Sequence, residues 1–511
     1  MAVPALDQSF TALPYRSLGD AALARAQELG ANHADFRFER VRYQTLGVRD
    51  GVLQGANDTE DLGFAVRVVH RGAWGFASGV VLTPEEAVRV AETAVAVAQV
   101  AAEMTSSPVE LADEPVHADV EWVSSYVVNP LEVPVRDKAD LLIDWTHRLR
   151  AGAAVDHASA HLLQVQENKY YADLSGTRTT QQRVRVHPGF EAMGAAADVF
   201  DSMASIAPPV GRGWEYLDGG PDSWDWDAEI AEVPELLAEK LAAPSVEAGR
   251  YDLVIHPSNL WLTIHESIGH ATELDRALGY EANYAGTSFA TPDLLGSLRY
   301  GSPVMNVTGD RTQPHGLATI GYDDEGVQTQ SWDLVRDGVL VGYQLDRAMG
   351  RMHPHLNPGP GGSGRSNGCA YADSPGHIPI QRMANVSLQP APDGPSTEEL
   401  IGRIEHGLYV VGDRSWSIDM QRFNFQFTGQ RFYRISGGRL AGQVRDAAYQ
   451  ATTTDFWRSM EAVGGPATWA LGGAFNCGKA QPGQVASVSH GCPTALFRDV
   501  RILNTTDEAG H

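Results

Sequence analysis

Cysteine is scarce in this chain: the 511 residues include only Cys369, Cys477 and Cys492. None of them forms a Cys-x-x-Cys pair, and so small and odd a number does not build the disulfide framework of a secreted domain. Long apolar runs are also missing, because polar residues interrupt even the alanine-rich stretch 91–102. A membrane-spanning helix needs about 18 or more apolar residues in a row. The sequence therefore predicts neither a disulfide scaffold nor a transmembrane helix.

Basic residues are also few relative to acidic ones. The sequence has 39 Lys and Arg against 64 Asp and Glu, which gives a formal net charge of -25. An acidic surface repels the phosphates of nucleic acids and of anionic lipids, so we expect neither nucleic acid nor a membrane as a partner. Residues 1–20 lack the basic start and apolar core of a signal peptide, and this predicts a cytoplasmic protein.

The chain is long enough for two domains and apolar enough to fill their cores, with 43% hydrophobic residues. Hydrophobic periodicity predicts helices over 18–29, 84–102 and 136–150, and strands over 36–48 and 62–69. Asp218–Ser223 is the clearest turn-rich break, and the last part of the sequence is rich in strand and turn patterns. We therefore predict an α+β protein, with an α/β N-terminal domain over 1–225 and a largely β C-terminal domain over 226–511 that carries a metal site.

The metal site is suggested by two histidines that bracket a glutamate in His265-Glu266-Ser267-Ile268-Gly269-His270. A zinc peptidase needs these groups, because neutral imidazoles hold the metal and a nearby carboxylate takes a proton from water. The alternative interpretation is a pair of helical histidines beside a solvated glutamate, since short motifs also match by chance. The motif by itself leaves both interpretations open.

The spacing of the two histidines is one residue longer than in the helical H-E-x-x-H motif. On a regular helix, residues five apart point about 140° away from each other. His265 and His270 can share an ion only if the helix bulges, opens or ends between them. A π-bulge, or unusual backbone angles at Gly269, would produce this. The β-prone residues 251–255, followed by Pro257, predict a strand that leads into the helix.

A zinc site needs a third ligand, and Cys477 is the best candidate. It lies in the glycine-rich segment 472–479, where Lys479 is close enough in sequence to favour a thiolate. The other interpretation is a small buried residue, which is what most free cysteines are. Spacing alone does not decide between the two.

Further segments follow the histidine motif in the order Asp323-Asp324-Glu325-Gly326-Val327, Arg382-Met383-Ala384-Asn385, Cys477-Gly478-Lys479 and Pro493-Thr494. Together with the motif, they resemble the TldD/PmbA family of zinc metallopeptidases, and their order resembles the TldD branch. Residues 30–35, 63–69 and 74–78 resemble the N-terminal part of that family more loosely. The resemblance therefore covers most of the chain.

The resemblance implies a ligand set and a partner. In the family, two motif histidines and a late cysteine bind zinc and the motif glutamate is the catalytic base, which here correspond to His265, His270, Cys477 and Glu266. The PmbA-like branch lacks the histidine pair and serves as the partner of the TldD-like subunit. The chain thus resembles the catalytic subunit of a hetero-oligomer. It departs from the family pattern at Ser489–Cys492, where small residues are expected.

The combined expectation is a Zn²⁺-dependent peptidase that hydrolyses peptide bonds in unfolded peptides or small proteins. The resemblance implies that peptide substrates enter an enclosed cavity as extended strands, a mode with little sequence preference. The alternative hypothesis is a non-catalytic scaffold that binds peptides or a partner subunit, with zinc in a closed structural site.

Two other features need an interpretation. Gly359–Ser366 is close to the phosphate-binding loop G-x-x-x-x-G-K-[ST], but arginine replaces the lysine and prolines stand where the preceding strand should be. We expect a flexible loop over the site instead. His315 and His490 stand in loop-like contexts, where a hydrogen-bonding role is expected ahead of stabilising an oxyanion.

Overall fold

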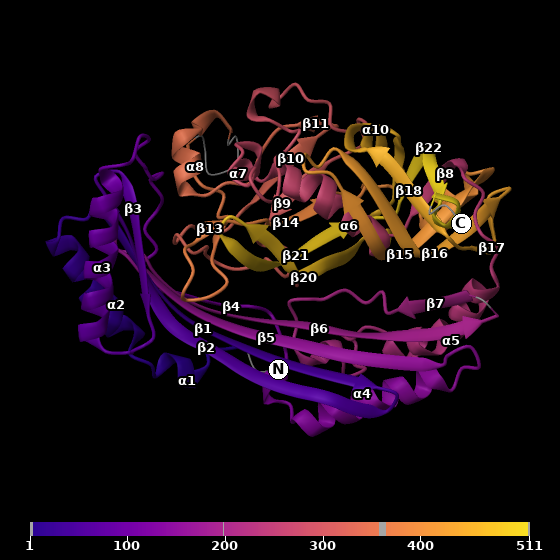
Figure 1. Cartoon of the computed structure of the whole chain (residues 1–511), viewed down its shortest axis with the longest axis horizontal. Coiled ribbons are helices and arrows are strands. Elements are labelled where there is room, and N and C mark those ends of the chain that lie inside the picture. Colours follow the sequence, from indigo (N-terminus) through magenta and orange to yellow (C-terminus); the bar gives the residue numbers. More distant parts are fainter. Residues whose placement is uncertain (1–3, 198, 357–363, 509–511) are drawn as a thin grey trace.

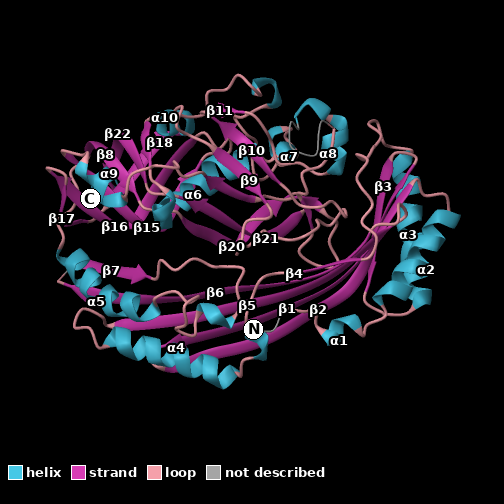
Figure 2. Ribbon diagram, turned by 180° about the vertical axis from the view of Figure 1, so that it is seen from behind, coloured by secondary structure: helices cyan, strands magenta, loops and turns pink. Residues whose placement is uncertain are grey.

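The N-terminal half of the chain forms a long curved sheet, and the C-terminal half lies against one face of it (Figure 1). The structure is a computed structural model that describes residues 4–197, 199–356 and 364–508. Helices cover the opposite face of the sheet, as the view from behind shows (Figure 2). The two halves therefore meet along the inner face of the curve.

Four long antiparallel strands make up most of the N-terminal sheet. They are β1 (His33–Arg49), β2 (Val52–His70), β5 (His157–Asp173) and β6 (Arg178–Ala196). Shorter strands complete the order β3-β2-β1-β5-β6-β4, with β7 beside β6: β3 (Ala73–Gly79), β4 (Val120–Val123) and β7 (Val199–Ala204). The strands predicted over 36–48 and 62–69 lie within β1 and β2. Among the described strands of this sheet, only β4 pairs in parallel.

Two pairs of helices pack on the outer face of the sheet. They are α2 (Tyr15–Glu28) with α3 (Pro84–Ala102), and α4 (Val135–Arg150) with α5 (Trp226–Ala242). α3 begins as its sequence suggests, because Thr83 accepts a hydrogen bond from the Glu86 N–H and Pro84 occupies the first turn. The predicted helices are confirmed, and α2 starts three residues earlier than expected.

The two faces of the N-terminal sheet differ in chemistry, because side chains alternate along a strand. Phe36 and Phe38 of β1 belong to the apolar cluster beneath α2 and α3. Arg37, between them, points to the other face and donates a hydrogen bond to the Ser374 carbonyl at 2.9 Å. The inner face is thus charged, yet it is buried against the C-terminal half.

Five strands of the C-terminal half close into a ring in which β8, β22, β18, β16 and β15 pair in turn, and β15 pairs again with β8. Their bounds are β8 (Gly249–Ile255), β15 (His406–Ile418), β16 (Asn424–Ser436), β18 (Ala447–Thr452) and β22 (Ala495–Asn504). The edge strands are β17 (Arg439–Val444) and β19 (Met460–Val463).

The remaining strands form three small sheets beside the ring. They are β20 (Ala470–Ala480) with β21 (Gly483–Cys492), β12 (Ala370–Tyr371) with β13 (Ile380–Gln381), and β9 (Val307–Asp310), β10 (Ser331–Arg336), β11 (Val339–Leu340) and β14 (Asn385–Leu388). The short helices are α1 (Gln8–Thr11), α7 (Leu274–Ala277), α8 (Arg347–Met352), α9 (Thr397–Gly402), α10 (Thr453–Arg458) and α11 (Thr505–Glu508).

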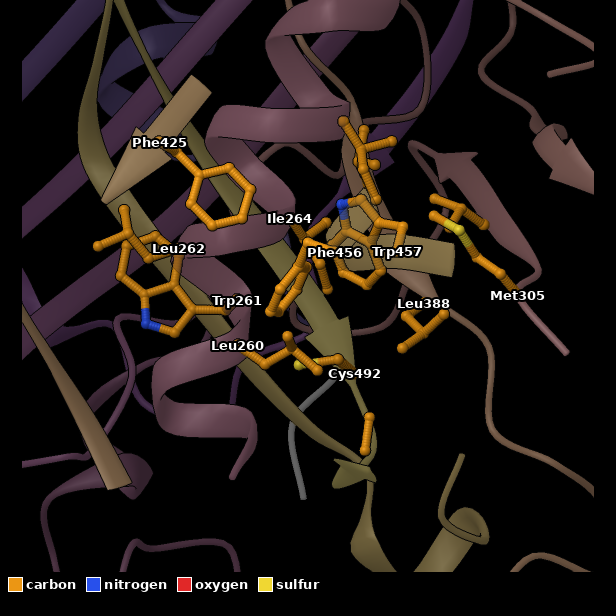
Figure 3. Close-up of a cluster of buried hydrophobic side chains, with 14 of the residues drawn as sticks. Leu260, Trp261, Leu262, Ile264, Met305, Leu388, Phe425, Phe456, Trp457 and Cys492 are labelled. Carbon is orange, nitrogen blue, oxygen red and sulfur yellow. The ribbon is translucent and has the colours of Figure 1, made fainter. Parts of the chain in front are cut away.

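The C-terminal core surrounds α6 (Pro257–Ile264), which follows β8 directly, as the sequence predicts. Every residue of α6 is buried. Leu260 and Ile264 lie in one cluster with Phe456 and Trp457 of α10 (Figure 3). A helix that is packed on all sides holds the residues at its end in place, and the histidine motif begins at that end.

These elements confirm the α+β class, with helices and strands in the first half and mainly strands in the second. The domain boundary between residues 225 and 226 stays a prediction; it falls directly before α5, whose Trp226 and Ile230 pack in the N-terminal core. In the part of the chain that the structure describes, no helix combines the length and the apolar character needed to cross a membrane.

Candidate metal centre

The two motif histidines lie where the helix widens. α6 ends at Ile264, and a π-helical turn over His265–Gly269 follows. In this turn the His270 N–H donates to the His265 carbonyl, a bond that spans five residues. The two imidazole rings come to lie 4.7 Å apart between centroids. The structure thus contains the bulge that the spacing of the histidines requires.

Gly269 contributes space and not the unusual backbone angles expected from the sequence. Its φ of -53° and ψ of -59° are those of a right-handed helix, which any residue adopts. A Cβ at this position would lie 2.6 Å from the Met383 Sδ. Gly269 therefore allows the chain that carries Met383 to pack closely behind the histidines.

A second irregularity places Cys477. The pairing of β20 with β21 shifts between Ala474 and Cys477, so that Phe475 and Asn476 form a β-bulge. The Cys477 Sγ lies 3.8 Å from the His270 Nε2. One ligand atom from each of His265, His270 and Cys477 lies within 4.8 Å of the others, and all three residues are buried.

Each histidine uses its Nδ1 in a hydrogen bond and so keeps its Nε2 available. The His270 Nδ1 lies 2.8 Å from a carboxylate oxygen of Glu273, and the His265 Nδ1 lies 2.7 Å from the Nε2 of His490. Burial acts to raise the pKa of Glu273, but Lys479 and His270 outweigh it and hold this pKa well below its usual value. Burial lowers the pKa of His265. A neutral imidazole and an ionised partner are what metal binding requires.

The residues that lower the pKa of the Cys477 thiol differ from Lys479, the residue expected from the sequence. Lys479 lies 3.3 Å from Glu273 and donates to the Gln381 carbonyl at 2.7 Å. Burial acts to raise the pKa of the Cys477 thiol, but His270 and then Arg382 outweigh it, so the pKa is lowered. Arg382 is fully buried, donates to the Cys477 carbonyl, and has two further nitrogens without a hydrogen-bond partner among the described residues.

Glu266 lies beside the histidines, is 5% exposed and lines the same cavity. Its Oε2 accepts a hydrogen bond from Arg422 at 2.7 Å. Burial acts to raise the pKa of Glu266, but His270, His265 and Arg422 outweigh it and lower this pKa. Arg422 was missed in the sequence, since it stands 156 residues away in a turn with no motif.

A cavity of about 470 Å³ opens in front of these residues, between the two halves of the chain. One wall is β20, from which residues 471–478 all line the cavity. The opposite wall is the N-terminal sheet, which contributes His161 and His187. The His187 ring stacks on Phe475 at 5.7 Å between centroids, so this contact joins the two walls. Sequence patterns gave no sign of these two histidines.

The other residues considered in the sequence analysis lie outside the proposed ligand group. Cys369 and Cys492 are buried outside the group. His315 lines a different cavity, and both ring nitrogens of His490 are engaged within the protein, so neither residue faces a substrate in this one. Residues 359–363 of the glycine-rich loop lie outside the described residues. The Ser366 N–H that follows them donates to Glu114, a carboxylate, at 2.9 Å.

The donor set suits zinc. Two imidazole nitrogens and a thiolate are the ligands that Zn²⁺ prefers, and catalytic zinc has three protein ligands and one open position. Within the described residues, the group of possible ligands consists of His265, His270 and Cys477. All three line the cavity together with Glu266, so a fourth position would face its interior.

Comparison with known proteins agrees with this geometry. Residues 248–504 match the model of the PmbA/TldA metallopeptidase C-terminal domain, and residues 34–98 match PmbA/TldA metallopeptidase domain 1. A metalloprotease of Methanothermobacter thermautotrophicus is 26% identical over 477 residues, which are 93% of this chain and 96% of the relative. The zinc metalloprotease TldD homolog of Saccharolobus solfataricus is 22% identical over 486 residues, which are 94% and 98% of the two chains.

Solved structures share the fold. TldE from Thermococcus kodakarensis has a TM-score of 0.69 at 14% identity and covers 95% of this chain and 99% of its own. A Thermotoga maritima protein has a TM-score of 0.72 at 16% identity over 96% of this chain and 100% of its own. Because the two family models together match more than half of the residues, the chain belongs to the TldD/PmbA family of metallopeptidases.

Proposed function

We propose that this chain is a zinc-dependent peptidase in which His265, His270 and Cys477 hold the metal and Glu266 is the general base. The observation that carries the proposal is the convergence of the three ligand atoms within 4.8 Å at the wall of a cavity that Glu266 also lines. Among relatives, the name zinc metalloprotease TldD homolog supports the choice of metal.

Each group of the proposed site has its own role in hydrolysis. Zinc, when bound, supplies a Lewis acid that polarises the scissile carbonyl and makes water easier to deprotonate. Glu266 takes the proton from that water and later delivers it to the leaving amine. Arg422 donates a hydrogen bond to the Glu266 Oε2 and so holds this carboxylate at the wall of the cavity. The same ion pair keeps the carboxylate in one orientation.

The substrate we propose is an unfolded peptide or small protein that lies along β20 as an extended strand. Two observations support this mode. In the described part of the chain β20 pairs with β21 alone, and its residues 471–478 line the cavity in an unbroken run. An added strand is held by main-chain hydrogen bonds, which give affinity with little dependence on side chains.

A second, PmbA-like subunit is part of the proposal, as is a cytoplasmic location. One protein of the same fold is TldE from Thermococcus kodakarensis. We expect the isolated chain to cleave peptides poorly and the mixture with its partner subunit to cleave them well. Sizing chromatography with light scattering, combined with a peptide-cleavage assay of each fraction, measures both. Full activity of a monomeric fraction would remove the partner from the proposal.

The test of catalysis is Glu266→Gln. This variant keeps the shape of the side chain but not its basicity, so we expect bound zinc and the fold to persist while cleavage falls by a factor of at least about 100. Glu103→Gln, at the exposed end of α3, is the control and keeps full activity. Unchanged cleavage by Glu266→Gln would remove Glu266 as the general base, whereas loss of cleavage with zinc and fold retained would exclude the scaffold hypothesis.

A further inference from the structure

His490 links one of the proposed zinc ligands to the backbone of a neighbouring strand. It lies in β21 and is 0% exposed. Its Nδ1 is 2.8 Å from the Val386 carbonyl of β14, and its Nε2 is 2.7 Å from the Nδ1 of His265. The stretch 489–492 is also where the sequence departs from the small residues expected by resemblance. The mechanism described above does not use this side chain.

The direction of these hydrogen bonds follows from the chemistry of the atoms. A carbonyl oxygen only accepts, so the His490 Nδ1 must carry the proton that it donates to Val386. Full burial favours the neutral ring, whose Nε2 is then an acceptor. The proton in the contact between the two rings must therefore belong to the His265 Nδ1. His265 is left with an unprotonated Nε2, and this is the nitrogen a metal needs.

The ring of His490 is fixed in place on its other sides. The indole of Trp261 stacks on it at 6.2 Å between centroids, with 14° between the planes. The backbone on either side is tied to β14, since the Ser489 N–H donates to Asn385 at 3.2 Å and the Gly491 N–H to Ser387 at 2.9 Å. The ring therefore has little room to turn away from His265.

We propose that His490 is a positioning residue that sets the tautomer and the orientation of His265, so that its Nε2 faces the metal position. The two imidazole ligands then have different support. The Nδ1 of His270 is hydrogen-bonded to a carboxylate, that of Glu273. The Nδ1 of His265 is hydrogen-bonded to the neutral ring of His490, which in turn donates to the Val386 carbonyl. A carboxylate makes a ligand more basic, and a neutral partner does so less, so His265 is the weaker donor of the pair.

The inference rests on the proposed zinc site and is tested by zinc affinity, without any assay of activity. His490→Phe keeps a flat ring against Trp261 but removes both hydrogen bonds, so we expect zinc affinity to fall by about 10- to 100-fold. His490→Gln offers an acceptor and a donor on one carbon, as the imidazole does, so it restores most of the affinity. Competition with a chromophoric chelator gives the dissociation constant of each variant. The absorption spectrum after Co²⁺ substitution reports whether the coordination geometry changes.

Thr494→Val is the matched control, because it removes a partly buried side-chain hydrogen bond with Thr397 just beyond β21 and does not reach His265. Its zinc affinity should equal that of the wild type. Equal affinity of His490→Phe and wild type would overturn the inference, as would a His490→Gln variant as weak as His490→Phe. A wild-type chain with no measurable zinc affinity would overturn the proposed function as well, so the two failures are distinguishable. Far-ultraviolet circular dichroism of each variant identifies a loss of the fold.

Discussion

At the scale of single residues, the site depends on which atom of each side chain remains free. The hydrogen bonds of His265 and His270 use Nδ1, and the Nε2 of His270 lies 3.8 Å from the Cys477 Sγ. Glu266 is oriented in a similar way, because Arg422 donates a hydrogen bond to its Oε2. The proposed ligands follow from the sequence motif and the family resemblance, but the orientation of each side chain depends on its hydrogen-bond partner in the folded chain.

The cysteine ligand can be tested against a cysteine of the same chain. In Cys477→Ala the metal loses one of three ligands, so we expect zinc content after gel filtration to fall from about one ion per chain to well below it. Cys369→Ala is the control, since Cys369 is also fully buried but lies outside the ligand group. Atomic absorption of both variants measures the content. Undiminished zinc in Cys477→Ala would remove this residue from the site.

At the scale of elements, two irregularities place the proposed ligands. The π-helical turn brings His270 round to His265, and the bulge in β20 turns Cys477 towards them. The π-helical turn follows α6, which is buried throughout, and the bulge lies within β20, which pairs with β21. α6 starts at Pro257, and the Nδ1 of the preceding residue, His256, accepts a hydrogen bond from the Ser258 N–H and so caps the helix. That cap requires an unprotonated nitrogen.

The His256 cap makes a prediction about pH. Burial, assisted by Arg431, lowers the pKa of His256 to about 4, against 6.5 for the ordinary group. The folded state therefore binds fewer protons than the unfolded state in this range. The stability contributed by the neutral cap is fully present above pH 6.5 and is lost as the pH falls towards 4, by at most about 1.4 kcal/mol per pH unit.

Urea unfolding of the zinc-free chain at a series of pH values measures this slope. His256→Asn is the matched variant, because asparagine is a good helix cap that does not titrate in this range. We expect a shallower loss of unfolding free energy between pH 6.5 and 4 in the variant. Identical slopes would mean that the cap is not coupled to the stability of the fold.

At the scale of the whole molecule, the two halves are joined through a buried network of charges. Lys169 of the N-terminal sheet lies 2.7 Å from Asp324 of the C-terminal half, 3.1 Å from Glu39 and 3.5 Å from Glu167. It is one of four lysines in the sequence, and all four are buried. Because Lys169 lies in β5 and Asp324 in the C-terminal half, this contact joins the two halves.

Removing the positive charge of Lys169 should lower the stability of the fold. Lys169→Met leaves three buried carboxylates without their shared partner, so we expect the free energy of unfolding to fall by about 3–5 kcal/mol. Arg16→Met is the control, because its pair with Asp119 is exposed and contributes about 0–1 kcal/mol. Denaturant unfolding followed by tryptophan fluorescence measures both. A loss in Lys169→Met no larger than in the control would show that the network adds little to stability.

Much of the local structure could be predicted from the sequence. Hydrophobic periodicity and capping residues act within one or two turns, so α3, α4 and the strand that leads into α6 were expected close to where they lie. The requirement for a distortion between His265 and His270 also followed from spacing alone. These features depend on neighbours along the chain, and neighbours along the chain are visible in a sequence.

The arrangement of the site could not be predicted from the sequence, because it depends on contacts between distant segments of the folded chain. His490 is 225 residues from His265, Arg422 is 156 residues from Glu266, and His187 meets Phe475 across the gap between the halves. No period or motif links such pairs, because long-range packing brings them together. The same holds for Gly269, which gives Met383 room rather than bending the helix. Short motifs thus indicate the kind of chemistry, whereas packing between distant segments sets the orientation and protonation of the groups that we propose for it.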